Sequence, residues 1–328
     1  MQNVRSPGSI SESDARTDGA LAPRSLESIR GRFRGLILLA GSPREGRLAR
    51  AVGRSVLDLP VRSGSSILAV WAKQAAQVAE ALGVPECRVR VILNKAARKP
   101  EVLGFAEKFP SVKLSVEFDR EEFRGTGGLL RDLAEDYLPG DLVLVCNGNQ
   151  VVLDPLATLL ESLVQVPSDV GILASEDGAP LGLKLFDAAI FREIKAKGFV
   201  DLNEQALPAL VRTHDVRVVT SNRTAIYPVR ELDDYIHALH AANTPESETR
   251  SDPLAEDWFE SFRLVEEGAT IGAGARVHDS IVLEGGRVGA GALLVRSVVC
   301  PGAEVAAGEV VSDQVVSSGA SRAREASR

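Results

Sequence analysis

A seventeen-residue repeat near the end of the chain limits the possible folds more than any other feature of the sequence. Three consecutive copies fill Thr270–Ala320, and apolar residues return in each copy at intervals of six, four and seven residues. The resulting columns are Ile271, Val288 and Val305; Val277, Leu294 and Val311; and Ile281, Val298 and Val315. An amphipathic helix would place apolar residues three and four apart, whereas this spacing suits one short strand on each side of a triangle. We therefore predict a short parallel β-helix of three coils over residues 269–320, with an ordinary β-meander as the alternative.

Residues 32–243 follow a different pattern, in which continuous apolar runs alternate with helical stretches. The predicted strands are Gly35–Ala40, Arg88–Leu93, Lys113–Val116, Asp141–Cys146, Asp169–Leu173, Leu181–Phe186 and Val216–Thr220. The predicted helices are Ser66–Leu82, Gly127–Tyr137, Pro155–Val164, Ala188–Lys197, Asn203–Arg212 and Arg230–Ala241. Strands that are apolar throughout are typical of a parallel sheet covered on both faces, so we predict an α/β domain with a Rossmann-like, mostly parallel sheet. Such a sheet binds its ligand at the carboxyl ends of the strands.

The remaining segments are polar and lack periodicity. We expect a disordered arm over residues 1–31 and a disordered tail over residues 321–328. Residues 244–268 are predicted to form a linker with one short amphipathic helix, Pro253–Val265, whose aromatic side chains can dock against a neighbouring element. Because three coils bury little surface by themselves, we expect the β-helix to pack on the first domain or on another subunit, as in a homo-oligomer.

Charge and cysteine content argue against several classes of function. A net charge of −7 gives an acidic surface, which would repel nucleic acid and anionic membranes. Cys87, Cys146 and Cys300 are odd in number and far apart, so we predict buried thiols in a cytoplasmic protein rather than a disulfide framework or a metal site. We expect neither a secretory signal nor a membrane span, since no apolar stretch approaches ~18 residues.

Two glycine-containing turns lie near the ends of predicted strands, where a ligand would bind. The first strand runs into Ala40-Gly41-Ser42 and then Gly46-Arg47; backbone N–H groups of such a loop can approach phosphates, and Arg47 adds positive charge. Gly125-Thr126-Gly127 opens a predicted helix, and a flat base or ribose can lie against such a small-residue turn. Glu117 is either a base or sugar contact or an exposed strand end.

In this order the segments resemble those of the nucleotide-sugar pyrophosphorylases, the sugar-1-phosphate nucleotidyltransferases. The matching segments are Ala40–Leu48 for the family's AGGxGTRL-like loop, Val56–Val61 for KPLLPV, Gly125–Leu130 for GTAGAL, Leu142–Asn149 for LVLNGD, Gly182–Asp187 for AGIYVFD and Gln205–Leu210 for DLLPALL. Members often carry a hexapeptide-repeat left-handed β-helix at the C-terminus. The resemblance therefore covers roughly Gly35–Ala320 and implies that the β-helix is left-handed.

The resemblance implies binding of a nucleoside triphosphate or nucleoside-diphosphate sugar and of a sugar phosphate, with Mg²⁺ if the protein is an active enzyme. It assigns a catalytic role to Arg47. The residues that it implies for nucleotide binding are Ala40, Gly41, Ser42, Gly46, Glu117, Gly125, Thr126 and Gly127.

The sequence departs from the family at positions that hold the metal or supply basic charge. Asn149 replaces the aspartate of the NGD motif, Pro228 falls near the position of a later aspartate, and Val56 replaces a lysine. Asn149 and Asp154 are the candidate metal ligands that remain, although Asp154 also suits a helix cap. Two interpretations stay open: a Mg²⁺-dependent nucleotidyltransferase, or a non-catalytic homologue that binds a nucleotide or sugar nucleotide and serves regulation or assembly.

Overall fold

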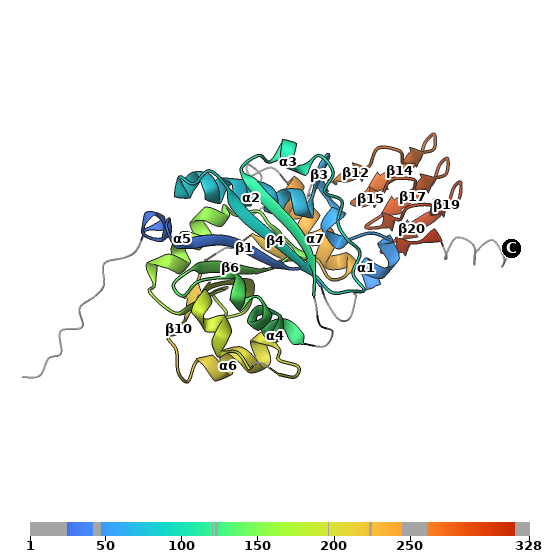
Figure 1. Ribbon diagram of the computed structural model, residues 1–328. Helices are drawn as coiled ribbons and strands as arrows, with labels where there is room; N and C mark the ends of the chain where they lie inside the picture. The colour runs from blue at the N-terminus through green and yellow to red at the C-terminus, as the bar shows by residue number, and fades with distance from the viewer. Residues whose placement is uncertain are drawn as a thin grey trace, which may run out of the picture.

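The chain forms an α/β domain with a β-helix packed at its side (Figure 1). The computed structural model describes residues 25–41, 47–119, 121, 124–195, 197–222, 225–244 and 261–318. The predicted fold class, a Rossmann-like sheet followed by a short parallel β-helix, is confirmed. Among the described residues, no helix combines the length and the apolar character needed to cross a bilayer.

The centre of the α/β domain is a seven-stranded sheet, and each of the seven predicted strands contributes one strand to it. The strands are β1 (Phe33–Leu39), β4 (Cys87–Leu93), β5 (Val112–Phe118), β6 (Leu142–Asn147), β8 (Val170–Ala174), β9 (Pro180–Asp187) and β10 (Val216–Thr220). Their order across the sheet is β5-β4-β1-β6-β9-β8-β10, and β9 alone runs antiparallel to its two neighbours. The short turn between β8 and β9 explains this direction, because a parallel connection needs a crossover of a dozen or more residues.

Helices cover both faces of the sheet (Figure 1). On one face lie α2 (Ile67–Leu82), α5 (Leu156–Gln165) and α7 (Leu232–Asn243); on the other lie α4 (Gly125–Asp132), η4 (Ala188–Glu193) and α6 (Leu207–Leu210). The longest helix, α2, begins where the Ser66 hydroxyl accepts a hydrogen bond from the Ala69 N–H and ends at Gly83 in the left-handed conformation.

The shorter elements connect these layers. They are η1 (Leu26–Ile29), α1 (Arg47–Val52), η2 (Val56–Asp58), β2 (Pro60–Arg62), β3 (Ser65–Ser66), α3 (Phe105–Lys108), η3 (Ala134–Asp136), β7 (Gln150–Val152), η5 (Leu202–Ala206) and β11 (Ile226–Pro228). Two of the predicted helices take other forms: Ala188–Glu193 is a 3₁₀ helix, and Leu202–Ala206 is a π-helical turn that leads into α6.

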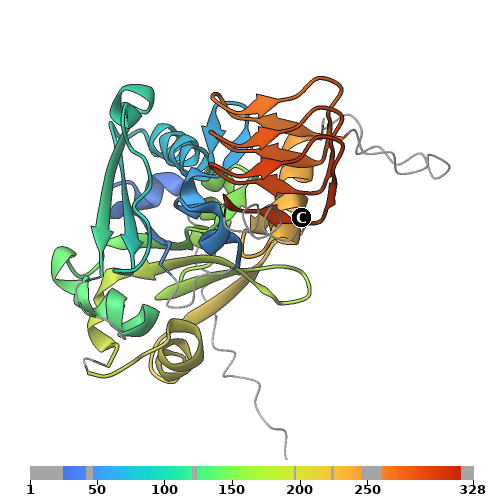
Figure 2. The ribbon, with the colours of Figure 1, turned by 90° about the vertical axis from the view of Figure 1, so that its right-hand side faces the viewer.

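The repeat forms the β-helix, and its three columns pair in the predicted register. The strands are β13 (Thr270–Ile271), β14 (Arg276–His278), β15 (Ser280–Val282), β16 (Arg287–Val288), β17 (Leu293–Val295), β18 (Val298–Val299), β19 (Glu304–Val305), β20 (Val310–Ser312) and β21 (Val315–Val316). Ile271 pairs with Val288, Val277 with Leu294, and Ile281 with Val298, all in parallel. Each side of the β-helix is therefore one parallel sheet of stacked short strands (Figure 2).

One sheet of the β-helix packs on the α/β domain. Ile281, Val282, Val298 and Val299 are all fully buried, although neighbouring residues of a strand point to opposite faces. This sheet is therefore covered on both sides, by the interior of the β-helix and by the α/β domain. The apolar columns of the repeat predicted burial of Ile281 and Val298. The burial of Val282 and Val299 identifies the outer side of this sheet as the docking face.

The structure corrects two predicted segments. Of the helix predicted over Pro253–Val265, residues 253–260 lie outside the described part, and Arg263–Val265 form strand β12, which pairs with β15. The β-helix thus gains an extra strand before its first coil, because an edge strand next to β15 satisfies backbone groups that a helix would leave unpaired. At the other end of the chain, η1 occupies part of the predicted arm, with Ile29 only 2% exposed.

Candidate functional site

Two neighbouring cavities open at the carboxyl ends of β1, β4 and β6. The first has a volume of about 390 Å³ and the second about 270 Å³. Leu39, Gly41 and Leu93 line both, so the end of β1 and the end of β4 form the partition between them. This is the edge at which sheets of this kind bind ligands, and an elongated ligand can span both cavities.

The first cavity is lined by arginines and side-chain amides. Its polar lining residues are Arg54, Ser55, Arg98, Asn147, Asn149, Gln150, Arg230 and Glu231. Arg98 and Arg230 are exposed, and neither side chain has an ion-pair partner among the described residues. Their charge is therefore available to an anion in the cavity.

Buried contacts from α2 fix the amide-bearing turn at the end of β6. The Trp71 indole N–H donates to the Gly148 carbonyl oxygen at 2.9 Å. The Gln74 amide group donates to the carbonyl oxygens of Val152 and Asp154, and its Oε1 accepts from the Leu156 N–H. A hydrogen-bonded turn between buried elements keeps its side chains in a fixed place, so the site is preorganised.

A short antiparallel ribbon brings two of the three positions that depart from the resembled enzymes into the same cavity. Gln150 of β7 pairs with Pro228 of β11, and the Val229 N–H donates to the Asn149 carbonyl oxygen at 2.9 Å. Asn149 and Pro228 both line the first cavity. The positions that the sequence comparison assigned to metal-binding carboxylates therefore converge, and neither holds a carboxylate.

The described residues around the first cavity do not fit a magnesium site. Their one carboxylate, Glu231, accepts a hydrogen bond from the backbone N–H of Asp234 and caps helix α7. Magnesium in proteins is usually held by one or two carboxylates together with substrate phosphates. Among the described residues there is also no cluster of three or more histidine, cysteine, aspartate or glutamate side chains suited to a metal.

The second cavity is more apolar and carries charges of both signs at its rim. Its lining includes Ile92, Asn94, Lys95, Asp119, Glu121, Arg124, Thr126, Leu129 and Phe199. The Arg124 guanidinium is already paired with Glu121 at 3.0 Å and Asp132 at 2.6 Å. Phe199 is 55% exposed, which leaves an aromatic surface open for stacking.

The glycine turns serve close packing as well as ligand access. A Cβ atom on Gly41 would lie 2.2 Å from the Asn94 backbone nitrogen, and one on Gly125, whose φ is +71°, would lie 2.4 Å from the Val200 carbonyl oxygen. That carbonyl also accepts the N–H groups of Gly127 and Gly128, at 2.9 and 3.3 Å. These two N–H groups are consequently not open to a ligand.

The structure groups some of the predicted site residues and separates others. Ala40 and Asn149 line the first cavity, Gly125 and Thr126 the second, and Gly41 both. Ser42 and Gly46 lie outside the described residues. Arg47 is the first residue of α1, and its side chain is outside the described part.

Three predicted residues lie away from both cavities. The Glu117 carboxylate accepts hydrogen bonds from Nε and Nη2 of the buried Arg90, at 2.9 and 2.7 Å, and so belongs to an internal ion pair. Asp154 accepts a hydrogen bond from the Ala225 N–H and fixes the chain before β11. Gly127 is buried against Val200. The polar geometry of each is explained by folding, without a ligand.

Sequence reasoning missed the residues that charge the first cavity. Arg54 and Arg230 stand in no motif, and only their spatial neighbourhood identifies them. Arg98 of the first cavity and Lys95 of the second gave a weak signal, because they follow the strand that ends at Leu93.

No protein-family model matches the sequence, and no curated protein matches it. Among solved structures, HddC from Yersinia pseudotuberculosis is matched at 17% identity with a TM-score of 0.46, over 63% of this chain and 98% of HddC. HddC complexed with GMP-PN is matched at 17% identity with a TM-score of 0.44, over the same shares. The homologue of Mycobacterium tuberculosis rv0371c from Mycobacterium sp. strain JC1 is matched at 15% identity with a TM-score of 0.42, over 65% of this chain and 98% of that protein. With TM-scores below 0.5, these likenesses decide nothing about function, so the functional inference rests on the site.

Proposed function

We propose that this chain binds a nucleotide or a nucleoside-diphosphate sugar across the two cavities, without Mg²⁺ and without efficient nucleotidyl transfer. One observation carries the proposal: Asn149 and Pro228 line one cavity, at the two positions where the resembled enzymes hold metal-binding carboxylates. A cavity that offers arginines and amides in place of carboxylates attracts phosphate directly and has little affinity for a bare divalent cation.

The phosphates occupy the first cavity. Arg98 and Arg230 supply positive charge, and the amide groups of Asn147 and Asn149 supply neutral hydrogen-bond donors. Neither amide has a side-chain hydrogen bond within the described residues, so a phosphate oxygen competes with water alone for them. Arginine is well suited to this task because its planar guanidinium binds two phosphate oxygens at once.

The base occupies the second cavity. Leu129 and Phe199 give it apolar and aromatic surface, while Asn94, Lys95 and Asp119 stand at the rim for contacts with polar edges. The shared partition at Leu39 and Gly41 lets one ligand pass from the base side to the phosphate side. A nucleotide has this combination of a flat base and a charged end.

The second candidate function is an active, Mg²⁺-dependent sugar-1-phosphate nucleotidyltransferase. The order of the sequence motifs favours it, together with a site at the expected edge of the sheet. It requires carboxylates from outside the described lining of the first cavity.

Thermal-shift and calorimetric titrations separate the two functions. Wild-type protein is titrated with nucleoside triphosphates, diphosphates and diphosphate sugars, in EDTA and in Mg²⁺, and pyrophosphate release is assayed with a panel of sugar 1-phosphates. We expect binding of equal strength in EDTA and no pyrophosphate release. Binding that needs Mg²⁺, or turnover with any pair of substrates, contradicts the proposal.

Variants then locate the phosphates. Arg230→Gln should weaken nucleotide binding about tenfold, as expected for loss of one hydrogen-bonded charge, whereas Arg212→Gln, an equal charge change on an exposed residue away from both cavities, should leave it unchanged. Asn149→Asp adds the missing carboxylate and should weaken binding in EDTA, with Mg²⁺ restoring part of the loss. Equal nucleotide affinities of the two arginine variants would show that the phosphates do not bind in the first cavity.

A further inference from the structure

Arg54 stands between the ligand site and the β-helix. It lines the first cavity and also a cleft of about 1100 Å³, the interdomain cleft, which runs between the α/β domain and the β12 end of the β-helix. Its two terminal nitrogens bind the Glu266 carboxylate at 2.9 and 2.6 Å, and each of the two side chains is 22% exposed. Glu266, a residue of the β-helix module, thus forms an ion pair with an arginine that lines the ligand cavity.

Glu266 is held in place by its own module. It directly follows β12, its backbone N–H donates to the Val282 carbonyl oxygen, and its Oε2 accepts the Glu284 N–H at 2.8 Å. The carboxylate is therefore fixed on the β-helix before it meets Arg54. Fixing the carboxylate lowers the entropic cost of the ion pair and strengthens it.

While this ion pair exists, the Glu266 carboxylate neutralises the positive charge of Arg54. Both forked nitrogens are used by Glu266, and the Asp58 carboxyl lies near enough to interact with the same guanidinium. The third nitrogen of the guanidinium, Nε, is buried without an acceptor among the described residues. A buried donor without an acceptor lowers the stability of the folded protein, and a phosphate oxygen that accepts a hydrogen bond from Nε would remove this penalty.

We propose that Glu266 and the phosphates of a bound ligand compete for Arg54, so that docking of the β-helix sets the affinity of the first cavity for anions. This inference rests on the proposed function for the identity of the natural ligand. Linkage makes the effect reciprocal: a ligand that takes Arg54 weakens the contact at Glu266, and loss of that contact strengthens anion binding.

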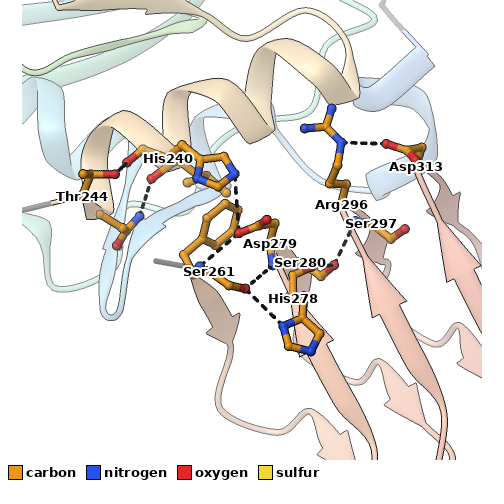
Figure 3. Close-up of polar contacts among 12 residues, drawn as sticks. His240, Thr244, Ser261, His278, Asp279, Ser280, Arg296, Ser297 and Asp313 are labelled. Carbon is orange, nitrogen blue, oxygen red and sulfur yellow. Dashed lines mark hydrogen bonds and ion pairs between the residues drawn. The ribbon is translucent and has the colours of Figure 1, made fainter. Parts of the chain in front are cut away.

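Other contacts keep the β-helix docked when this pair opens. Arg296 binds Asp233 of α7 at 2.9 Å. The His240 Nε2 atom lies 3.5 Å from the Asp279 carboxylate (Figure 3). The Phe262 ring also packs edge-on against His240, with centroids 5.0 Å apart. Competition at Arg54 is consequently a local change at one end of the interface, and removal of Glu266 leaves a folded protein.

The test uses the full chain with inorganic pyrophosphate as the probe. Glu266→Gln should tighten pyrophosphate binding threefold to tenfold in calorimetry. Glu267→Gln is the matched control, since it makes the same charge change one residue away in the same cleft and should alter affinity less than twofold. In an Arg54→Gln background, Glu266→Gln should lose its effect. Equal effects of the two glutamate variants, or weaker binding by Glu266→Gln, overturn the proposal.

The same titrations separate this inference from the proposed function. If nucleotides fail to bind while Glu266→Gln still tightens pyrophosphate, the proposed function falls and this inference stands. If neither wild type nor Glu266→Gln binds pyrophosphate, the inference falls.

Discussion

Asp58 carries a carboxyl group that the fold makes harder to ionise. Burial raises its pKa to about 6, and the Glu101 N–H and the nearby Arg54 only partly oppose this rise. The folded protein thus holds the proton more tightly than the unfolded chain, whose carboxyl titrates near 3.8. The resulting stabilisation is complete below pH about 4 and is lost as the pH rises through about 6.

Asp58→Asn should therefore remove a pH-dependent loss of stability. Urea unfolding at a series of pH values should show the variant gaining on wild type between pH about 4 and about 7, and then keeping a constant difference. Asp177→Asn is the control of opposite sign: a hydrogen bond from the Ser175 hydroxyl lowers the pKa of Asp177, so its contribution is lost as the pH falls through the acid range. A flat Asp58→Asn difference across this range would contradict the prediction.

Glu117 illustrates how a structural role can imitate a binding role in the sequence. It shares the buried Arg90 with Asp136 and the Tyr137 hydroxyl, and Ser115 donates to it at 2.7 Å. Glu117→Gln should lower the free energy of unfolding by about 1–3 kcal/mol, because it weakens a hydrogen bond between charged groups next to a buried arginine. Nucleotide affinity should not change. Loss of affinity with unchanged stability would return Glu117 to the ligand site.

At the residue scale, sequence predicted the candidate site where backbone geometry determines it. Gly41, Gly125 and Asn149 were predicted from their places in turns and at a strand end, and the structure places all three in the lining of the two cavities. Arg54 and Arg230 were missed, since their role depends on segments far apart in the chain. Asp154 lines neither cavity, and its carboxylate accepts the Ala225 N–H.

At the scale of elements, periodicity predicted strands well and their surroundings less well. All seven strands of the main sheet were recognised, because a strand buried on both faces is a continuous apolar run. All three columns of the β-helix were recognised, because buried residues return every seventeen positions. Arg263–Val265 was read as helix because a three-residue strand is too short to show alternation. Its pairing with β15 is a tertiary contact that local sequence does not encode.

The corners of the β-helix carry a signal that the column analysis overlooked. Asp279, Arg296 and Asp313 stand seventeen residues apart, and all three adopt a positive φ, of 47°, 47° and 53°. Glycine would suit such corners better, so the charged side chains have another use. Arg296 binds Asp233 of α7. Asp279 lies against His240 of the same helix (Figure 3). The repeat thus encodes both its coils and its docking contacts.

The interior columns of the β-helix should account for much of its stability. Leu294 is fully buried in the middle coil, whereas Val310, on the same sheet, is 67% exposed. Leu294→Ala should cost about 2–5 kcal/mol by leaving a cavity, and Val310→Ala should change the free energy of unfolding by less than about 0.5 kcal/mol. Urea unfolding measures both. Similar small effects would mean that the column does not form a packed interior.

At the scale of the whole molecule, the two modules share one hydrophobic core. A single cluster of buried side chains extends from Leu36 and Trp71 in the α/β domain to Val282, Leu294 and Val299 in the β-helix. The helices on the other face of the sheet pack in a separate cluster around Ile37 and Phe186. The two modules therefore differ in their sequence patterns, but their buried side chains pack together as one core.

This continuity predicts that the α/β domain and the β-helix unfold together. Three coils form too small a core to persist alone, and their docking face loses its cover if the α/β domain unfolds. Calorimetry of the full chain should show one transition, with equal calorimetric and van't Hoff enthalpies.

Hydrogen exchange of the Leu294→Ala variant provides the sharper form of this test. The loss of unfolding free energy measured at the Leu144 N–H, in the centre of the main sheet, should equal the loss measured at the Val298 N–H in the β-helix. Val310→Ala should leave both positions unchanged. If only Val298 responded, the β-helix would open as an independent unit, and ligand-controlled docking through Arg54 would then involve movement of the whole module instead of a single ion pair.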